Sequence, residues 1–270
     1  MRIAIVGGDA RMPYTARALE AQGHEVTLSA HGDIPLSPEA LSRAEAVLLP
    51  MPLSRDSETL NAPLSLLPVP LSSLFAMIPE GATLLAGNED PLLAALSCGR
   101  PFRYYGRDEE YARRNSHITA EGAISLLLRS LPMTLSETPC LLLGSGRLAV
   151  ALLDLLRGLH APVTVVARRT EPLPDGTRPS PLGALPAELH RASVILNTVP
   201  APLLSSSLLR LSPEGTLLLE LSAAKGVLDE RDVRAAGITL ITAPALPGRY
   251  APMSAGRALA DAVTAHLTVL

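Results

Sequence analysis

Tryptophan is absent from this chain of 270 residues, and aromatic side chains make up only 3% of it. Basic residues are not in excess either, since 23 Lys and Arg stand against 26 Asp and Glu, for a net charge of −3. This balance excludes the basic surface of a nucleic-acid-binding protein. No uninterrupted apolar run reaches the ~18 residues of a membrane-spanning helix, and the first residues resemble a strand and turn more than a signal peptide. We therefore expect a cytoplasmic protein with no nucleic-acid or membrane partner.

Cysteine is scarce, with two residues in the whole chain. Cys98 and Cys140 stand far apart, which is the spacing of neither a metal site nor a local disulfide. We expect both to be small core residues and expect no metal site.

Apolar residues are abundant, at 47% of the chain, so a chain of this length can build two cores. Short apolar runs alternate with helical patterns, which predicts an α/β fold with two doubly wound, mostly parallel sheets. We expect a flavodoxin-like α/β domain at residues 1–118, with a helix at 252–270 packing back onto it. A linking helix at 119–137 should lead to a Rossmann domain at 138–251. Proteins of this build bind ligands near the carboxyl ends of their strands.

Two proline-rich stretches are expected to contain little regular structure. Residues 51–79 are crowded with Pro and Ser, and residues 171–186 are rich in Pro. Clusters of these residue types are typical of loops, so we expect surface connections in both places.

The most informative motif follows the apolar run Cys140–Leu143 and reads Gly144-Ser145-Gly146-Arg147-Leu148-Ala149. A helical pattern and a second strand, expected at 162–167, come after it. This is G-x-G-x-x-A in the strand–turn–helix–strand context that identifies a dinucleotide-binding turn. Gly144 allows the tight turn, Gly146 lets the backbone approach a pyrophosphate, and Ala149 lets helix and strand pack closely. The helix N-terminus then favours the anion. The alternative is a glycine turn in a βαβ unit that binds nothing.

The end of the second strand indicates which nucleotide binds. NAD-binding domains carry an acidic residue there to bond the ribose 2′-hydroxyl, whereas this chain has Arg168 and Arg169. Guanidinium groups suit a 2′-phosphate, so we predict NADP as cofactor. Two solvated arginines at a strand end are the alternative.

Two later segments are candidates for further cofactor contacts. Asn197-Thr198-Val199-Pro200 follows a buried strand, and its asparagine can hold ribose hydroxyls or simply build a turn. The rigid segment 243–248, which includes Leu246 and Pro247, can bring backbone groups to the nicotinamide carboxamide or serve as a plain connector.

In the N-terminal half, Gly7-Gly8-Asp9-Ala10-Arg11 resembles a phosphate-binding turn without the third glycine. Arg11 either holds a substrate carboxylate or forms a surface ion pair with Asp9.

A second polar segment in this half carries Arg107, Asn115, His117, Thr119 and Glu121, before and at the start of the linking helix. Thr119 is also a candidate N-cap of that helix, and a lone His is more often structural than catalytic.

Taken together and in order, these segments resemble the A subunit of dipicolinate synthase. The matching pieces are residues 5–11, 107–108, 115–116, 119–122, the glycine turn, 197–200, 243–248, 251–252 and 255–256. The resemblance implies an NADP-linked oxidation of dihydrodipicolinate, or of its hydroxylated precursor, to dipicolinate during endospore formation. It also implies that the partner is the flavoprotein-like B subunit, and that the location is the mother-cell cytoplasm.

For such a diacid, the planar guanidinium groups of Arg11 and Arg107 are the candidates for carboxylate binding. Asn115, Thr119 and Glu121 are candidates to line the substrate side, with His117 or a water accepting the proton. Two alternatives remain. One is another NADP-dependent oxidoreductase, acting on a hydroxy acid or shikimate-like substrate. The other is a scaffold protein that binds the cofactor without catalysis. A homo-oligomer is compatible with either.

Overall fold

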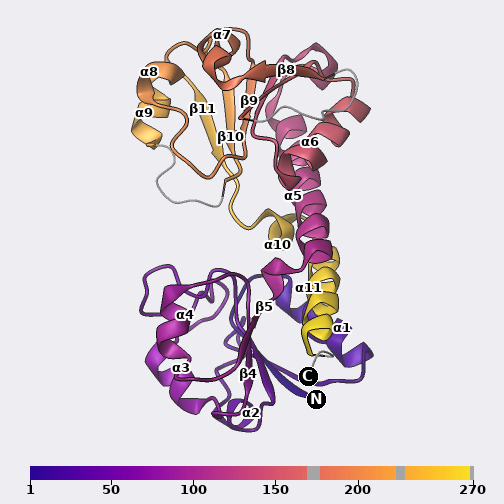
Figure 1. Ribbon diagram of the computed structural model, residues 1–270, viewed down its shortest axis with the longest axis vertical. Helices are drawn as coiled ribbons and strands as arrows, with labels where there is room; N and C mark the ends of the chain where they lie inside the picture. Colours follow the sequence, from indigo (N-terminus) through magenta and orange to yellow (C-terminus); the bar gives the residue numbers. More distant parts are fainter. Residues whose placement is uncertain (169–176, 223–228, 268–270) are drawn as a thin grey trace. The chain divides into compact units, whose positions relative to one another are not determined.

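The computed structural model describes residues 1–168, 177–222 and 229–267. The chain divides into two compact units. Unit 1 contains Met1–Ile118 together with Pro247–Leu270, and unit 2 contains Thr119–Leu246. Each unit has its own parallel sheet with helices on both faces (Figure 1), so the predicted fold class is confirmed. In the described part of the chain, no helix combines the length and the hydrophobicity needed to span a membrane.

The sheet of unit 1 has five strands in the order β2-β1-β3-β4-β5, and each neighbouring pair is parallel. This is the strand order of flavodoxin-like folds. The strands are β1 (Arg2–Val6), β2 (Glu25–Ser29), β3 (Ala46–Leu48), β4 (Thr83–Ala86) and β5 (Phe102–Tyr104).

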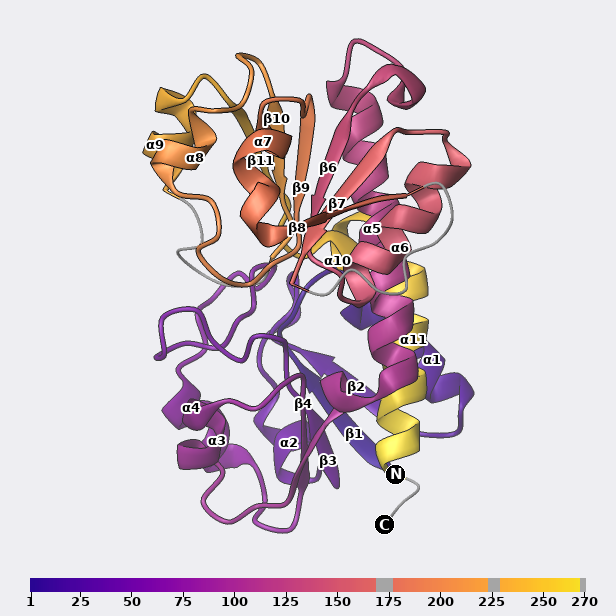
Figure 2. The ribbon, with the colours of Figure 1, turned by 45° about the horizontal axis from the view of Figure 1, so that its top comes forward.

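Helices cover both faces of this sheet because its central strands are apolar on both sides. Alternate residues of β1 belong to different cores: Ile3 and Ile5 to one, Ala4 and Val6 to the other. Helices α1 and α11 cover the first face, and α2, α3 and α4 cover the second (Figure 2). The helical elements of this unit are α1 (Met12–Ala21), α2 (Pro38–Ser42), α3 (Leu71–Met77), α4 (Pro91–Leu96), η1 (Tyr105–Arg107), α10 (Leu246–Tyr250), whose first residue belongs to unit 2, and α11 (Pro252–Leu267).

The C-terminal helix α11 packs along α1. Gly256 makes this contact possible, since a Cβ there would lie 2.7 Å from the carbonyl oxygen of Arg11 and 2.6 Å from the Cβ of Tyr14. The start of α1, which carries Arg11, is thereby held against the end of the chain.

The sheet of unit 2 has six parallel strands in the order β11-β10-β9-β6-β7-β8. Numbered within the unit, this is the order of a Rossmann sheet, with the switch point between its first and fourth strands, β6 and β9. The strands are β6 (Cys140–Leu143), β7 (Val163–Ala167), β8 (Arg178–Pro181), β9 (Val194–Asn197), β10 (Leu217–Glu220) and β11 (Thr239–Thr242).

Apolar side chains on both faces of this sheet bind the helices of unit 2. Helix α6 (Arg147–Gly158) buries Ala149, Leu152, Leu153 and Leu156, a spacing that forms one helical stripe. The second half of α5 (Glu109–Ser130) shares that core, while α7, α8 and α9 cover the other face. The remaining elements are η2 (Leu135–Glu137), η3 (Leu182–Ala184), α7 (Leu185–Leu189), α8 (Ser206–Leu209) and α9 (Glu230–Ala235).

The expectation that Thr119 caps the linking helix is wrong. Helix α5 begins ten residues earlier, at Glu109, and the carboxylate of Asp108 accepts a 2.6 Å hydrogen bond from the backbone N–H of Tyr111. Asp followed by Glu109 and Glu110 is a strong helix-start signal, because the acidic groups satisfy free N–H groups and complement the helix dipole.

The proline-rich stretches contain more regular structure than expected. Residues 177–186 include strand β8, whose prolines, Pro179 and Pro181, are tolerated because β8 is at the edge of the sheet. Residues 171–176 lie outside the described part. In the stretch 51–79, α3 forms where the apolar residues Leu71, Leu74 and Phe75 share one helix face and are buried.

The expectation that both cysteines are core residues holds for only one of them. Cys140 is buried at the start of β6, whereas Cys98 is exposed. Cys98 lies in a turn at the surface of unit 1, with a φ of 48° and just before Gly99.

Candidate functional site

In unit 1, a cluster of polar side chains is built on the loop that follows β1. The strand order of the sheet reverses between β1 and β3, and ligands of open α/β sheets bind beyond the strand ends at such a point. The loop turns sharply at Gly7 and Gly8, with φ angles of 64° and 82°. It then places Asp9 and Arg11 at the start of α1.

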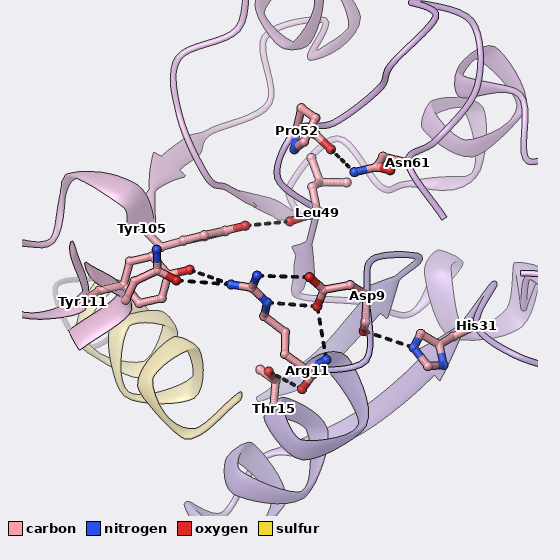
Figure 3. A network of polar contacts seen from close by, with 10 residues as sticks. Asp9, Arg11, Thr15, His31, Leu49, Pro52, Asn61, Tyr105 and Tyr111 are labelled. Atoms are coloured by element: carbon pink, nitrogen blue, oxygen red, sulfur yellow. Dashed lines mark hydrogen bonds and ion pairs between the residues drawn. The ribbon is translucent and has the colours of Figure 1, made fainter. Parts of the chain in front are cut away.

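Asp9 and Arg11 form a two-point ion pair (Figure 3). The Arg11 Nε donates to Oδ1 of Asp9 at 2.9 Å, and Nη2 donates to Oδ2 at 3.0 Å. The ion pair with Asp9 that the sequence left open is therefore present, but it is largely buried, since the Arg11 residue is 8% exposed. A bidentate arrangement of this kind fixes the orientation of the guanidinium plane.

Helix α5 contributes two more side chains to the same guanidinium. The Arg11 Nη1 lies 3.4 Å from the hydroxyl oxygen of Tyr111 and 3.4 Å from Oδ1 of Asn115. Tyr111 and Asn115 are four residues apart, which puts them on one face of the helix. The structure therefore brings two predicted site residues, Arg11 and Asn115, together.

Sequence reasoning did not find the two tyrosines of this cluster. The ring of Tyr105 meets that of Tyr111 edge to face, with centroids 5.5 Å apart, and its hydroxyl donates to the carbonyl of Leu49 at 3.2 Å. In a chain with so few aromatic residues, two tyrosines near an acidic helix start were a usable signal.

The electrostatics of the cluster keep the guanidinium charged and both phenols neutral. Burial alone lowers the pKa of Arg11, but interactions with Tyr111 and Asp9 outweigh it, and the pKa is raised overall. Burial raises the pKa of Tyr111, and it raises the pKa of Tyr105 well above its ordinary value. Near neutral pH both hydroxyl groups therefore keep their protons and can donate hydrogen bonds.

Two further contacts hold Asp9 in place. The Nε2 of the buried His31 lies 3.1 Å from the backbone carbonyl of Asp9 (Figure 3), which can only accept, so this nitrogen carries the proton. On the other side, a Cβ added at Gly248 would lie 2.4 Å from the Asp9 carboxylate. The segment 243–248, expected to carry backbone groups to a cofactor, thus packs its glycine against Asp9.

The other predicted residues of this half lie elsewhere. Arg107, in η1, forms an exposed ion pair with Glu89 and lies over the ring of Tyr104 at 5.2 Å. His117 is exposed on α5, and its two-residue offset from Asn115 puts it on a different helix face. In unit 2, Thr119 is half-buried and Glu121 is exposed.

In unit 2, the glycine turn joins β6 to α6 at the switch point of the sheet. Gly144 has a φ of 105°, and a Cβ there would lie 2.5 Å from Oγ1 of Thr198. That hydroxyl donates to the carbonyl of Leu143 at 2.7 Å. The turn from β6 and the turn from β9 are thus in direct contact.

The first turn of α6 is open to a ligand. Ser145, Gly146 and Arg147 are exposed, and a Cβ at Gly146 would meet nothing within 4 Å among the described residues. Its N-cap residue, Gly146, offers no side chain to cap the helix start, so the N–H groups of α6 are directed at the space where a dinucleotide pyrophosphate fits. Leu148 is half-buried behind the turn.

Asn197 uses its side chain to build the neighbouring turn. It is fully buried, its Nδ2 donates to Glu220 at 2.7 Å, and its Oδ1 accepts from the N–H of Val199 at 3.1 Å. Thr198 and Val199 are half-buried and Pro200 is exposed. The surface that this turn offers to a ligand is therefore made by residues 198–200 and the backbone.

Arg168 follows the last residue of β7 and is exposed, whereas Arg169 lies outside the described residues. Leu246 is buried in the apolar core of unit 2, and Pro247 is buried as well.

A hollow of about 390 Å³ lies at the amino ends of the strands of unit 2, opposite to the glycine turn. Its lining includes Pro139, Pro162 and Arg178, which lie at or next to the amino ends of β6, β7 and β8. Its described lining contains none of the predicted site residues, and ligands of this fold bind at the carboxyl ends of the strands.

Comparison with solved structures shows first which proteins share this fold. The D-lactate dehydrogenase of Escherichia coli superposes with a TM-score of 0.65, covering 100% of this chain and 98% of its own at 13% identity. With its two doubly wound sheets and its glycine turn at a switch point, the chain has the two-domain fold of dehydrogenases.

More specific matches follow. Residues 2–105 match the family described as the N-terminal domain of the dipicolinate synthase A subunit. The crystal structure of the A subunit of dipicolinate synthase from Bacillus halodurans matches with a TM-score of 0.87 and 25% identity, covering 98% of this chain and 97% of its own. The dipicolinate synthase A subunit of Bacillus subtilis is 26% identical over 287 residues, which is 98% of this chain and 95% of the relative. The chain is thus similar to the dipicolinate synthase A subunit over nearly its whole length, and the resemblance seen in its sequence is confirmed.

Proposed function

We propose that the chain catalyses the NADP-dependent oxidation of dihydrodipicolinate, or of its hydroxylated precursor, to dipicolinate as the A subunit of a dipicolinate synthase. The observation that carries the proposal is the glycine turn at the β6/β9 switch point, in a chain similar to that protein over 98% of its length. A glycine turn that binds nothing has no need of the open helix start that follows Gly144.

The residues of unit 2 fit a dinucleotide. Gly146 leaves room for the pyrophosphate, and the free N–H groups of α6 favour its negative charge. Arg168, exposed at the end of β7, is suited to a 2′-phosphate and supports NADP over NAD. Residues 198–200, Leu246 and Pro247 remain candidates for the nicotinamide side through their backbone groups.

When bound, NADP⁺ supplies the hydride acceptor. Oxidation of the dihydropyridine releases one hydride and one proton, and the gain of aromaticity drives it. The hydroxylated precursor also loses a water molecule. The protein's own residues must therefore orient the ring, hold its carboxylates and receive a proton.

Arg11 is the residue of unit 1 best suited to hold a carboxylate. It is charged, its plane is fixed by Asp9, and Asn115 lies beside it. Arg107 is a second candidate, although a carboxylate would have to compete with Glu89 there. Asn115, Thr119 and Glu121 remain candidates to line the substrate side, and His117, exposed to solvent, remains a candidate proton acceptor.

The proposal also includes a partner protein and a cellular location. The likeness to one named subunit of a synthase supports a second polypeptide as partner, which we take to be the flavoprotein-like B subunit. The same likeness supports a role in the mother-cell cytoplasm during sporulation.

The experiment is an activity assay on the purified chain. Dihydrodipicolinate and NADP⁺ are supplied with and without the partner protein, and both NADPH and dipicolinate are quantified. We expect equal amounts of the two products. D-Lactate is tested in parallel, because the fold is shared with a D-lactate dehydrogenase. Oxidation of D-lactate without dipicolinate formation would favour a hydroxy-acid enzyme. Absence of turnover under all conditions would favour the scaffold.

A further inference from the structure

The Arg11 guanidinium has two hydrogen-bonding edges, and only one of them is firmly occupied. Its five N–H groups form a fork, and Asp9 takes the edge formed by Nε and Nη2 at 2.9 and 3.0 Å. On the other side, Nη1 contacts Tyr111 and Asn115 at 3.4 Å each. Such contacts are longer than the usual 2.9–3.0 Å of an N–H···O bond and are correspondingly weak. An anion can replace them at little cost.

The hydroxyl of Tyr111 has a proton to donate. In its contact with Arg11 this hydroxyl is the acceptor, and it donates to no group among the described residues. The neighbouring Tyr105 differs, because its hydroxyl already donates to the carbonyl of Leu49. A buried hydroxyl donor next to a buried guanidinium calls for an acceptor that carries negative charge.

The cluster can be approached from the side of Asp9 and Asn115. The Asp9 side chain is 21% exposed and Asn115 is half-buried, whereas Tyr111 and Arg11 are buried. A carboxylate that arrives beside Asn115 meets Nη1 of Arg11 and the hydroxyl of Tyr111. The guanidinium then lies between this carboxylate and that of Asp9, so the two negative groups are both attracted to it.

We infer that Tyr111 and Arg11 together bind one carboxylate of the substrate, with Tyr111 donating its hydroxyl proton in a hydrogen bond and Asp9 holding the guanidinium in place. This inference rests on the proposed function. It assigns substrate contact to Tyr111 of α5 in addition to Asn115. It also explains why the Tyr111 hydroxyl is kept buried with no acceptor among the residues that the structure describes.

The test compares two buried tyrosines. Dipicolinate is titrated calorimetrically, in the presence of NADP⁺, into the wild-type protein and into Tyr111→Phe and Tyr105→Phe. Loss of a hydrogen bond to a charged group predicts that Tyr111→Phe weakens dipicolinate binding by about tenfold or more. Tyr105→Phe should bind dipicolinate as the wild type does, although it loses a buried hydrogen bond and melts at a lower temperature.

The outcomes separate the inference from the function beneath it. If the wild type binds dipicolinate and Tyr111→Phe binds it equally well, the inference is overturned and the proposed function stands. If both folded variants lose affinity alike, Tyr111 acts only through packing, and the inference is again overturned. If the wild type binds no dipicolinate, the proposed function fails first.

A second measurement does not depend on the folding of Tyr111→Phe. The protein contains five tyrosines, of which Tyr105 and Tyr111 are the buried ones. In Tyr105→Phe labelled with 3-fluorotyrosine, the one buried fluorine resonance belongs to Tyr111. We expect this resonance to shift on addition of dipicolinate, and an unchanged resonance at saturation would contradict the inference.

Discussion

Gly248 lies directly against the carboxylate of Asp9, although the two are far apart in the sequence. A Cβ at position 248 would come within 2.4 Å of Oδ2 and 2.6 Å of Oδ1 of Asp9. The same carboxylate holds both Nε and Nη2 of Arg11, so it has little freedom to move. Because residue 248 has no side chain, α10 can pack directly against the polar cluster of unit 1.

Replacement of Gly248 by Ala should destabilise unit 1. The added methyl must displace either Asp9 or α10, and overpacking of this kind costs about 1–3 kcal/mol. Urea denaturation measures the change. Gly81→Ala is the matched control, because a Cβ there meets nothing within 4 Å among the described residues. A free energy of unfolding unchanged in Gly248→Ala would show that the contact is easily relaxed.

Asp9→Ala should cost about 3 kcal/mol of stability, the lower end of the range for breaking a buried ion pair, because it leaves the Arg11 charge without its partner. The partial exposure of Asp9 places the expectation at that lower end. The control is Glu110→Ala, which breaks an exposed pair with Arg113 and should change stability far less, because solvent screens such a pair. Equal losses in the two variants would mean that the Asp9–Arg11 pair contributes no more than a surface pair.

The two glycines of the turn after β6 should respond differently to replacement. Gly144→Ala places a side chain at a φ of 105° and against Thr198, which should cost about 1–3 kcal/mol of stability. Gly146→Ala meets open space and should keep the wild-type melting temperature, while its affinity for NADPH falls by about tenfold or more, because the methyl group occupies the approach of the pyrophosphate. Unchanged NADPH binding by Gly146→Ala would argue against a nucleotide at this turn.

Thiol labelling should distinguish the two cysteines. Burial raises the pKa of Cys140 to about 12, so this thiol is neutral and shielded, whereas Cys98 is exposed. We expect a thiol-reactive reagent to modify one equivalent in the native protein and two after unfolding in denaturant. A Cys98→Ser variant should then show no rapid labelling, and rapid labelling of that variant would contradict the burial of Cys140.

The sequence predicts best those elements that a few consecutive residues are enough to identify. The apolar runs that became β1, β6, β7 and β9 are buried on both faces, and strands of that kind are recognised from a few consecutive residues. The glycine turn was visible because strand, glycines and helix follow one another within one βαβ unit. The alternation of such units is sufficient to predict two doubly wound sheets.

The polar cluster of unit 1 depends on contacts that no local pattern encodes. Arg11 and Asn115 are 104 residues apart, and only the packing of α5 against the sheet of unit 1 brings them together. The contact of Tyr111 with Arg11 depends on the same packing, and the only sequence signal for it is the pair of tyrosines near the acidic start of α5. The prediction for Thr119 fails for a different reason: the helix-start signal at Asp108, followed by two acidic residues, is present in the sequence and is stronger than a lone threonine.

The most direct test of the account is a titration with NADPH and with NADH, followed by nicotinamide fluorescence. Arg168 is exposed at the end of β7, and its guanidinium suits the 2′-phosphate that distinguishes the two coenzymes. We predict that the wild type prefers NADPH and that Arg168→Ala loses about tenfold or more of that preference. Arg157→Ala, which removes an exposed charge at the far end of α6, should keep it. Equal binding of NADPH and NADH by the wild type, or binding of neither, would contradict the account.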